Sequence, residues 1–408
     1  MEKYPNIVIE KSPESLKYKK LLLKEAGLCE FEDMSEVWDI PFSSKKLAYK
    51  THSIFRFYGK FPPPIARYLI ERYTDNNDLI LDPMCGSGTS AVEALLMKRQ
   101  IICADVSPIS QLLVNVKCRY IKDKVLIDAL REVNKKYNNK SRHIYDITRV
   151  PLEDSKIKHW FLPETYKNLL KLLNAIHSLQ DEDVRETYLC ILINIIRKTS
   201  KATSLQGRLF LDVDSAIKEP IDLFNKTAEK IIKSIETLPE DFEPPKFIMQ
   251  DIRQLKLKSG KPKLIICHPP YFNVYKFSSI FSLELPWLMC DKKSIRQQEL
   301  REFFKVGKKE NVHRYVEDMA AGIKNISQQM KKNTFFALMI GDTRIRGEYI
   351  RTTKLLLDSI ADCELTLISI AIRRPKFTEA SWVASQRRTG SKVGINISDF
   401  ILVFRKSI

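Results

Sequence analysis

Short apolar runs alternate with amphipathic helical stretches in the first part of the chain. Residues 79–82 (LILD) and 101–105 (IICAD) have the length and composition of buried strands, and residues 91–100 between them have a helical pattern. A strand, a loop, a helix and a second strand within ~30 residues predict a βαβ unit, in which the two strands are parallel. A further helix is predicted within residues 106–121.

Apolar strand patterns return in the second half of the chain. They cover residues 247–251 (FIMQD), 264–267 (LIIC), 335–342 (FFALMIGD), 364–372 (ELTLISIAI) and 399–406 (DFILVFRK). Strands that alternate with helices pair in parallel, whereas two successive strands pair in the antiparallel sense. The pattern therefore predicts an α/β fold with a mostly parallel sheet and an antiparallel last strand.

Residues 121–245 have a different character. They are charged and helical in period, with few strand signals. Ordinary crossover helices are one interpretation, but a crossover needs only about a dozen residues. We therefore expect a helical insertion in the α/β domain.

Composition adds an expectation about partners. Hydrophobic residues make up 44% of the 408 residues, which is enough for a sizeable core, and the formal net charge is +18. Such a positive surplus suits a polyanionic partner, although a lysine-rich surface that maintains solubility is the alternative. The eight cysteines include no CxxC pair, which argues against a zinc ribbon, and scattered thiols suggest the reducing cytosol. No apolar run approaches the ~20 residues of a membrane span and no signal-peptide core is present, so a cytoplasmic protein is expected.

The loop after residues 79–82 is the first candidate for chemistry. Gly86 and Gly88 allow the backbone to approach a ligand closely, and the start of the following helix favours an anionic group. No Gly-Lys-Ser/Thr follows, so this is not a Walker loop. Asp105 ends the second strand, where an acidic residue can accept hydrogen bonds from ribose hydroxyls. The alternative is a tight turn with a helix-capping aspartate.

The second candidate is His268-Pro269-Pro270-Tyr271, which follows the apolar strand 264–267. Ligands of α/β sheets bind at this end of a strand, and two prolines make the backbone rigid there. The Pro269 carbonyl could accept a hydrogen bond from a substrate amino group, and Tyr271 offers a ring for stacking a planar base. A structural polyproline corner is the alternative.

In order and strand context these motifs resemble those of the S-adenosylmethionine-dependent amino-methyltransferases of DNA, the cytosine-N4 and adenine-N6 enzymes of restriction–modification type. The resemblance rests on DPMCGSGT at 82–89 and HPPY at 268–271, with FYGKFPPP at 57–64 and GDTRIRG at 341–347 in support. It implies the Rossmann-like class I methyltransferase fold and S-adenosyl-L-methionine as cofactor. The family usually has Asp, Asn or Ser at the position of His268; Ser points toward cytosine N4, and Asp or Asn mostly toward adenine N6.

The resemblance also implies the site residues. Asp82, Gly86 and Gly88 would hold the methionine part of the cofactor, Asp105 its ribose and Asp251 its adenine. The full cofactor set is Phe61, Pro62, Asp82, Pro83, Cys85, Gly86, Gly88, Thr89, Asp105 and Asp251, and the catalytic set is His268, Pro269, Pro270 and Tyr271. No metal ligand is expected. The implied division is an N-terminal extension (1–50), a cofactor-binding half (51–120), the insertion as a possible target-recognition region (121–245) and a catalytic half (246–408).

Two basic stretches, 196–208 and 373–394, are candidates for phosphate contacts, with solvated basic loops as the alternative. The expected DNA-binding residues are Arg197, Lys198, Arg208, Arg373, Arg374, Arg387 and Arg388.

The sequence thus predicts a site-specific DNA methyltransferase that acts on a flipped base, with cytosine N4 favoured over adenine N6. An RNA amino-methyltransferase and a non-catalytic relative that binds nucleic acid are the alternatives. The expected partners are double-stranded DNA and a cognate restriction endonuclease, with no membrane. An unperturbed histidine is half protonated near pH ~6.5, so transfer that depends on a neutral His268 is expected to slow as the pH falls through that value.

Overall fold

The structure is a computed structural model, and it describes residues 4–139, 159–203, 209–212, 217–258, 260–272, 277–290, 292–300, 311–345, 348–373 and 395–407. The helices outside the insertion are α1 (Pro13–Ala26), α2 (Pro63–Tyr73), α3 (Thr89–Leu96), α4 (Pro108–Lys117), α10 (Phe277–Ile280), α11 (Lys292–Gln298), α12 (Val312–Ser327) and α13 (Thr352–Ser359). Short 3-10 helices are η1 (Cys29–Met34), η2 (Lys46–Ala48), η5 (Arg197–Thr199) and η6 (Leu285–Leu288).

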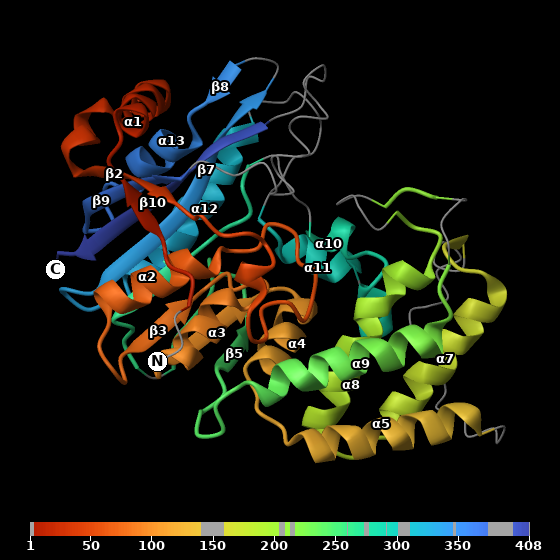
Figure 1. The fold of residues 1–408 in the computed structure, drawn as a ribbon. Helices are drawn as coiled ribbons and strands as arrows, with labels where there is room; N and C mark the ends of the chain where they lie inside the picture. The colour runs from red at the N-terminus through yellow and green to blue at the C-terminus, as the bar shows by residue number, and fades with distance from the viewer. Residues whose placement is uncertain are drawn as a thin grey trace.

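A single sheet organises the described residues (Figure 1). Its order is β1 (Val8–Glu10), β2 (Ser35–Asp39), β9 (Leu365–Arg373), β10 (Ile395–Lys406), β7 (Phe335–Ile345), β6 (Leu264–Cys267), β3 (Leu79–Asp82), β4 (Gln100–Asp105) and β5 (Lys246–Met249), while β8 (Glu348–Ile350) pairs with β7.

Strands β7, β6, β3, β4 and β5 are parallel neighbours. Strand β10 runs antiparallel to both β7 and β9. The predicted α/β fold, with a mostly parallel sheet and an antiparallel last strand, is therefore confirmed.

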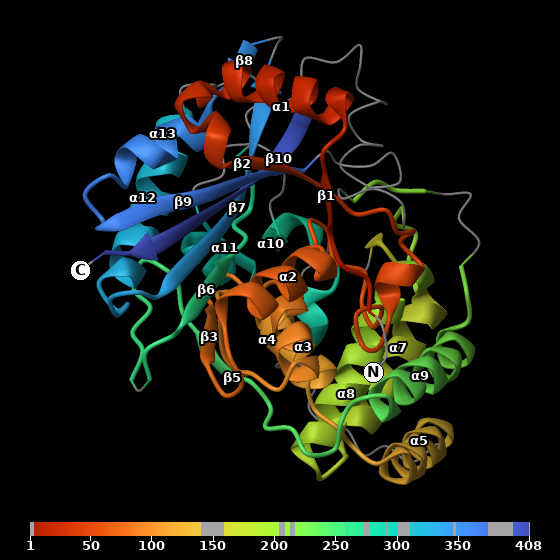
Figure 2. The same ribbon diagram turned by 60° about the vertical axis from the view of Figure 1, so that its left-hand side comes forward.

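Alternating side chains along each strand supply two apolar layers, because successive residues point to opposite faces of a sheet. Ile80 packs in the layer under α2 and α3, and Leu81 packs in the layer under α1, α12 and α13. Figure 2 shows α2 and α3 on one side of the strands and α12 and α13 on the other. The carboxyl ends of the parallel strands are therefore left facing the loops that follow them.

Local details differ from the sequence-based expectation. The helix predicted over 91–100 ends at Leu96, because the chain turns at Lys98, which has a φ of 57°, and Gln100 already belongs to β4. Residues 1–50 were expected as an extension, and within them β1 and β2 join the main sheet beside β9.

The described part of residues 121–245 contains α5 (Asp123–Asn138), α7 (Pro163–His177), α8 (Glu182–Ile196) and α9 (Pro220–Glu236). These helices gather beside the sheet, at the lower right of Figure 1, around an apolar cluster of their own. The cluster also includes the buried face of α4, residues from 54–58 and residues from 280–287. No helix in the described ranges is long and apolar enough to cross a membrane.

Candidate active site

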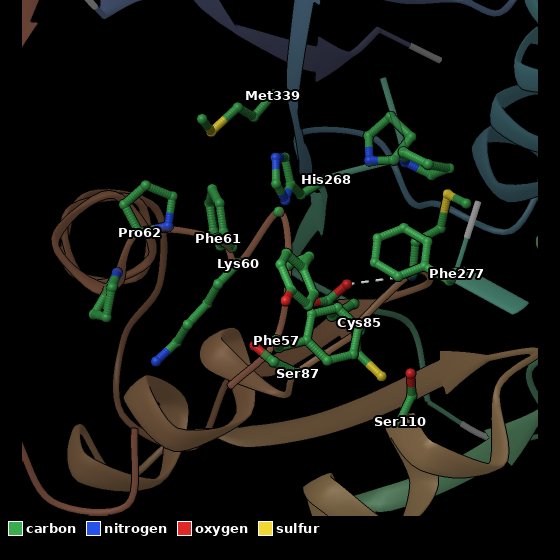
Figure 3. A pocket seen from close by; sticks show the side chains of 18 of the residues that line it. Phe57, Lys60, Phe61, Pro62, Cys85, Ser87, Ser110, His268, Phe277 and Met339 are labelled. Atoms are coloured by element: carbon green, nitrogen blue, oxygen red, sulfur yellow. Dashed lines mark hydrogen bonds between the residues drawn. The ribbon is translucent and has the colours of Figure 1, made fainter. Parts of the chain in front are cut away.

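A cavity of about 590 Å³ opens at the carboxyl ends of β3, β4 and β6. Four segments that are separate in the sequence line it, namely 55–63, 82–87 without Pro83, 105–107, and 268–271. Figure 3 shows Phe61 beside His268 and, across the cavity, Cys85 and Ser87 of the loop after β3. The topology therefore brings the two predicted motifs to one cavity.

The loop between β3 and α3 depends on its two glycines. Gly86 and Gly88 have φ values of 48° and 73°, a region that side chains rarely adopt. A Cβ atom on Gly88 would lie 3.0 Å from Cγ2 of Val114, and one on Gly86 would lie 3.3 Å from the Phe57 ring. The glycines are therefore needed both for the turn and for the close approach of α4 and Phe57.

Asp105 fixes this loop from the end of β4. Its Oδ2 accepts from the Gly86 amide at 2.9 Å, and its Oδ1 accepts from the Ser107 amide at 2.9 Å. Burial raises the pKa of the Asp105 carboxyl, whereas these backbone donors lower it. A carboxylate oxygen can accept a second hydrogen bond, so Asp105 still fits the ribose hydroxyls of a nucleoside.

Asp82 lies at the end of β3 and is 4% exposed. Burial raises the pKa of its carboxyl to about 7, and its Oδ1 accepts from the Met84 amide at 3.2 Å. Near neutral pH this side chain can therefore present a hydroxyl donor as well as an acceptor to a bound ligand.

Two lysines lie beside the loop, the half-buried Lys60 and the fully buried Lys117. Lys60 Nζ donates to the His52 carbonyl and Lys117 Nζ donates to the Ser87 carbonyl, each at 2.7 Å. Burial and the mutual repulsion of the two ammonium groups lower the pKa of Lys60 well below its usual value, and burial lowers the pKa of Lys117 to about 8. The nearby Glu93 carboxylate is already paired with Arg67 at 2.8 Å. A positive surplus of this kind suits a ligand carboxylate.

Neither lysine was among the predicted site residues. Lys60 lines the cavity within the quoted segment FYGKFPPP, where a lysine among aromatic and proline residues was the available signal. Lys117 carried no such signal, because lysines are common near the C-terminal ends of helices.

His268 follows β6 and lies among aromatic rings. Its imidazole centroid is 5.2 Å from that of Phe61 and 5.4 Å from that of Tyr271, with the Tyr271 ring at 87° to it. Burial lowers the pKa of His268 to about 4, with Asp399 acting in the opposite direction. The imidazole is therefore neutral at physiological pH and has one acceptor nitrogen.

The two proline carbonyls of the motif differ. The Pro270 carbonyl accepts from the Tyr315 hydroxyl at 2.9 Å. Within the described residues no group donates to the Pro269 carbonyl. Tyr315 thus anchors the turn while the preceding carbonyl can serve a ligand.

Tyr271 is hydrogen-bonded to strand β10. Its hydroxyl donates to Asp399 Oδ1 at 2.9 Å, and Arg373 Nε donates to Asp399 Oδ2 at 2.8 Å. Both charged residues are buried and line the cavity. Sequence reasoning missed Asp399, for which the only signal was an acidic residue at the start of the last apolar strand.

The structure distributes the predicted cofactor residues over three places. The main cavity is lined by Phe61, Pro62, Asp82, Cys85, Gly86 and Asp105, together with all four HPPY residues. A smaller cavity that shares Asp105 is lined by Pro83 and Asp251. The Asp251 carboxylate accepts from Arg253 Nε at 2.9 Å. Gly88 and Thr89 begin α3 behind the loop, where Thr89 is buried.

The expected phosphate contacts need correction at two residues. Arg197 is 9% exposed, and its Nε lies 3.0 Å from Glu284 Oε1. Arg373 is 5% exposed in its pair with Asp399. Both guanidinium groups are committed to buried ion pairs, so neither lies on the surface as a phosphate contact. Lys198 is exposed, while Arg208, Arg374, Arg387 and Arg388 lie outside the described residues.

Comparison with known proteins agrees with the resemblance. The family model N6_N4_Mtase, described as DNA methylase, matches residues 3–111. The type II methyltransferase M.MjaII of Methanocaldococcus jannaschii is 21% identical over 406 residues, covering 75% of each chain. The type II methyltransferase M.BsoBI of Geobacillus stearothermophilus is 25% identical over 307 residues, covering 64% of this chain and 58% of the relative.

Among solved structures, the rRNA methyltransferase aviRa from Streptomyces viridochromogenes aligns with a TM-score of 0.34 and 11% identity, over 90% of this chain and 94% of that chain. The resemblance to the amino-methyltransferases of DNA, of restriction–modification type, is confirmed by the family model and the type II relatives. The expected cofactor, S-adenosyl-L-methionine, is confirmed with it. In the described ranges no group of three His, Cys, Asp or Glu residues could hold a metal ion.

Proposed function

We propose that this chain, which resembles the amino-methyltransferases of DNA, is a site-specific DNA methyltransferase. It would transfer a methyl group from S-adenosyl-L-methionine to the exocyclic amino group of a flipped base. The observation that carries the proposal is that Asp82 and residues 84–87 of the loop, Asp105 and the four HPPY residues line one cavity. A methyl donor and an acceptor nitrogen must meet within a few ångströms, and a shared cavity allows this.

The residues present suit this cofactor. Asp105 would accept from the ribose hydroxyls, and Asp251 at the smaller adjoining cavity would accept from the adenine amino group. Lys60, which lines the cavity, would face the methionine carboxylate, while Lys117 would support the loop from behind through the Ser87 carbonyl. When bound, the cofactor supplies an electrophilic methyl group on a sulfonium.

The amino group of a nucleobase is a poor nucleophile because its lone pair is delocalised into the ring. Hydrogen bonds from its two N–H groups to the neutral His268 nitrogen and the Pro269 carbonyl would return electron density to nitrogen. The N–CH₃ bond forms as the S–CH₃ bond breaks, and the nitrogen then releases one proton. His268 would accept that proton, because an N-methylated amino cation is a far stronger acid than an imidazolium.

We place cytosine N4 ahead of adenine N6. His268 is uncharged in its half-buried setting. It therefore resembles the neutral serine of the cytosine-N4 members more than the aspartate of the adenine-N6 members. Tyr271 would stack on the extruded base, and basic surface residues would contact the phosphates of double-stranded DNA. A cognate restriction endonuclease is the partner that such a system implies.

The test is expression in a bacterial host that lacks DNA methylation, followed by single-molecule sequencing of the host DNA. The proposal expects N4-methylcytosine at one recurring sequence, and a chain carrying His268→Ala as control should leave that sequence unmodified. N6-methyladenine at a recurring sequence would keep the methyltransferase and correct the base. Unmodified DNA together with methylated tRNA or rRNA would overturn DNA as the substrate.

A further inference from the structure

A buried ion pair, Arg373–Asp399, contacts the HPPY motif through the Tyr271 hydroxyl. The transfer mechanism above gives neither residue a role. Arg373 at the end of β9 and Asp399 on β10 are opposite one another in the antiparallel ladder. They are 5% and 2% exposed, and both line the cavity that holds His268 and Tyr271.

The two carboxylate oxygens of Asp399 have separate partners. Oδ2 accepts from Arg373 Nε at 2.8 Å, and Oδ1 accepts from the Tyr271 hydroxyl at 2.9 Å. A hydrogen bond from a phenol to a carboxylate is charge-assisted and therefore among the stronger ones in proteins. Arg373 balances the charge of the Asp399 carboxylate within the buried site.

The backbone around Asp399 is irregular. The register of β10 against β7 shifts between Asn396 and Asp399. Irregularities of this kind re-aim side chains and are common beside active sites. A buried ion pair also stabilises a fold little, because removing both charges from water costs free energy; apolar residues of similar volume often give equal or greater stability. Both features favour a functional role for the pair.

Resting on the proposed function, we propose that Asp399 is a positioning residue for methyl transfer. Its carboxylate, balanced by Arg373, holds the Tyr271 ring by its hydroxyl in the orientation that receives the target base. The same ring stands edge-on to His268, with 5.4 Å between centroids. Asp399 therefore positions both the Tyr271 ring, which would stack on the base, and His268, which would accept from the amino group. It does so from β10, which is far from the HPPY turn in the sequence.

The proposal predicts that two different substitutions disturb one interaction. Tyr271→Phe removes the hydroxyl and keeps the Arg373–Asp399 pair, while Asp399→Asn removes the charge. Each should lower the single-turnover methylation rate about 10-fold or more, since misplaced reacting groups lose much of the advantage of orientation. The affinity for S-adenosylmethionine should stay within about twofold of the parent, because neither residue belongs to the cofactor loop.

The experiment measures single-turnover rates of the full chain on a duplex carrying its methylation site, with Kd for the cofactor from calorimetry. The double variant should be about as slow as the slower single variant, because both changes break the same hydrogen bond. Fluorescence of 2-aminopurine at the target position gives a second readout, and both single variants should change the emission of the bound, flipped base. Glu364→Gln is the matched control: it breaks the Lys406–Glu364 pair at the other end of β10 and should leave the rate unchanged.

Parental rates in Tyr271→Phe would overturn the inference, as would a double variant slowed by the product of the two single effects. If Asp399→Asn fails to fold, Tyr271→Phe decides the question alone, because it leaves the ion pair in place. A parent chain that methylates no nucleic acid would overturn the proposed function, and this role with it. An active parent with unaffected variants would overturn only the role of Asp399.

Discussion

His268 is a half-buried imidazole on the cavity wall, at the position where the family that this chain resembles has an oxygen-bearing side chain. Burial lowers its pKa to about 4, so it keeps its acceptor nitrogen well below neutral pH. We predict that His268 contributes no acid limb to the single-turnover rate between pH ~8 and ~5.5, measured at saturating DNA and S-adenosylmethionine so that titration in the cofactor site does not enter. Sequence alone predicts a fall in rate through pH ~6.5, because an unperturbed histidine titrates there.

The measurement is a pH series of rapid-quench methylation rates, with DNA affinity measured at each pH. His268→Ala should be ~10²-fold slower across the series, and His268→Asn should keep substantial activity, since its amide oxygen can accept the same hydrogen bond. An acid limb centred near pH 6.5 in the parent and absent from His268→Asn would show that the imidazole titrates as an exposed group.

Site residues could be predicted from the sequence where the residues that act with them are close to them in the chain. The HPPY turn and the glycine loop each carry their own signal within a few positions. Asp399 and Lys60 acquire their roles only from tertiary neighbours, Tyr271 in one case and the cofactor loop region in the other. The errors at Arg197 and Arg373 have the same origin, because a charged residue in a buried ion pair looks identical in sequence to one on the surface.

The turn from β3 into α3 sets how closely α4 can approach the cofactor loop. Gly88 has a φ of 73°, and a Cβ atom there would lie 3.0 Å from Val114 Cγ2. We predict that Gly88→Ala lowers the free energy of unfolding by about 1–2 kcal/mol and weakens cofactor binding, because the residue must be strained or the loop must move.

Denaturant unfolding and calorimetry with S-adenosylmethionine check this prediction. Val114→Ala removes the Cγ2 contact. The stability lost on Gly88→Ala should therefore be smaller in the Val114→Ala background than in the parent, and the loss that remains is due to backbone strain at residue 88. A Gly88→Ala protein as stable and as tightly binding as the parent would mean that the turn is not constrained.

Elements with long apolar or amphipathic patterns were predictable, and short edge elements were not. Strands β3, β4, β6 and β7 and helix α4 lie where their patterns indicated. Strand β1 spans only Val8–Glu10, and β8 only Glu348–Ile350. Strands this short are set by the neighbour that they pair with, so periodicity cannot reveal them.

Across the whole molecule, the helices of the insertion are packed against the wall of the active-site cavity. Phe55 lines the cavity and belongs to the apolar cluster that the insertion helices form. Arg197, at the end of α8, reaches Glu284 in the segment that follows the HPPY motif. Nothing in the local sequence pairs these residues, so the position of the insertion relative to the cavity was beyond sequence reasoning.

Lys198 follows Arg197 and is exposed beside this wall. Burial and the positive charges of Lys230, Lys218 and Arg56 lower the pKa of its ammonium group. Arg56 also lines the cavity. Like charges gathered beside an active site repel one another until a polyanion binds, so we predict that these residues contact DNA phosphates on either side of the flipped base.

Substitutions of Lys198 and of its neighbour Arg197 should have different effects, the first on DNA binding and the second on stability. Replacing Lys198 and Lys230 with Gln should reduce the slope of log Kd for DNA against log salt by about one unit per lost contact, without lowering the melting temperature. Arg197→Gln should instead lower the stability by roughly 3–5 kcal/mol, because it leaves Glu284 buried and unpaired. Fluorescence anisotropy over a salt series and thermal unfolding give the two readouts.

Lys324→Gln on α12 is the control, because Lys324 is exposed and paired with Asp362; it should change neither the salt slope nor the melting temperature. An unchanged salt slope in the Lys198 and Lys230 variant would remove this face of the insertion from the DNA-binding surface, because phosphates held there must displace counterions when they bind.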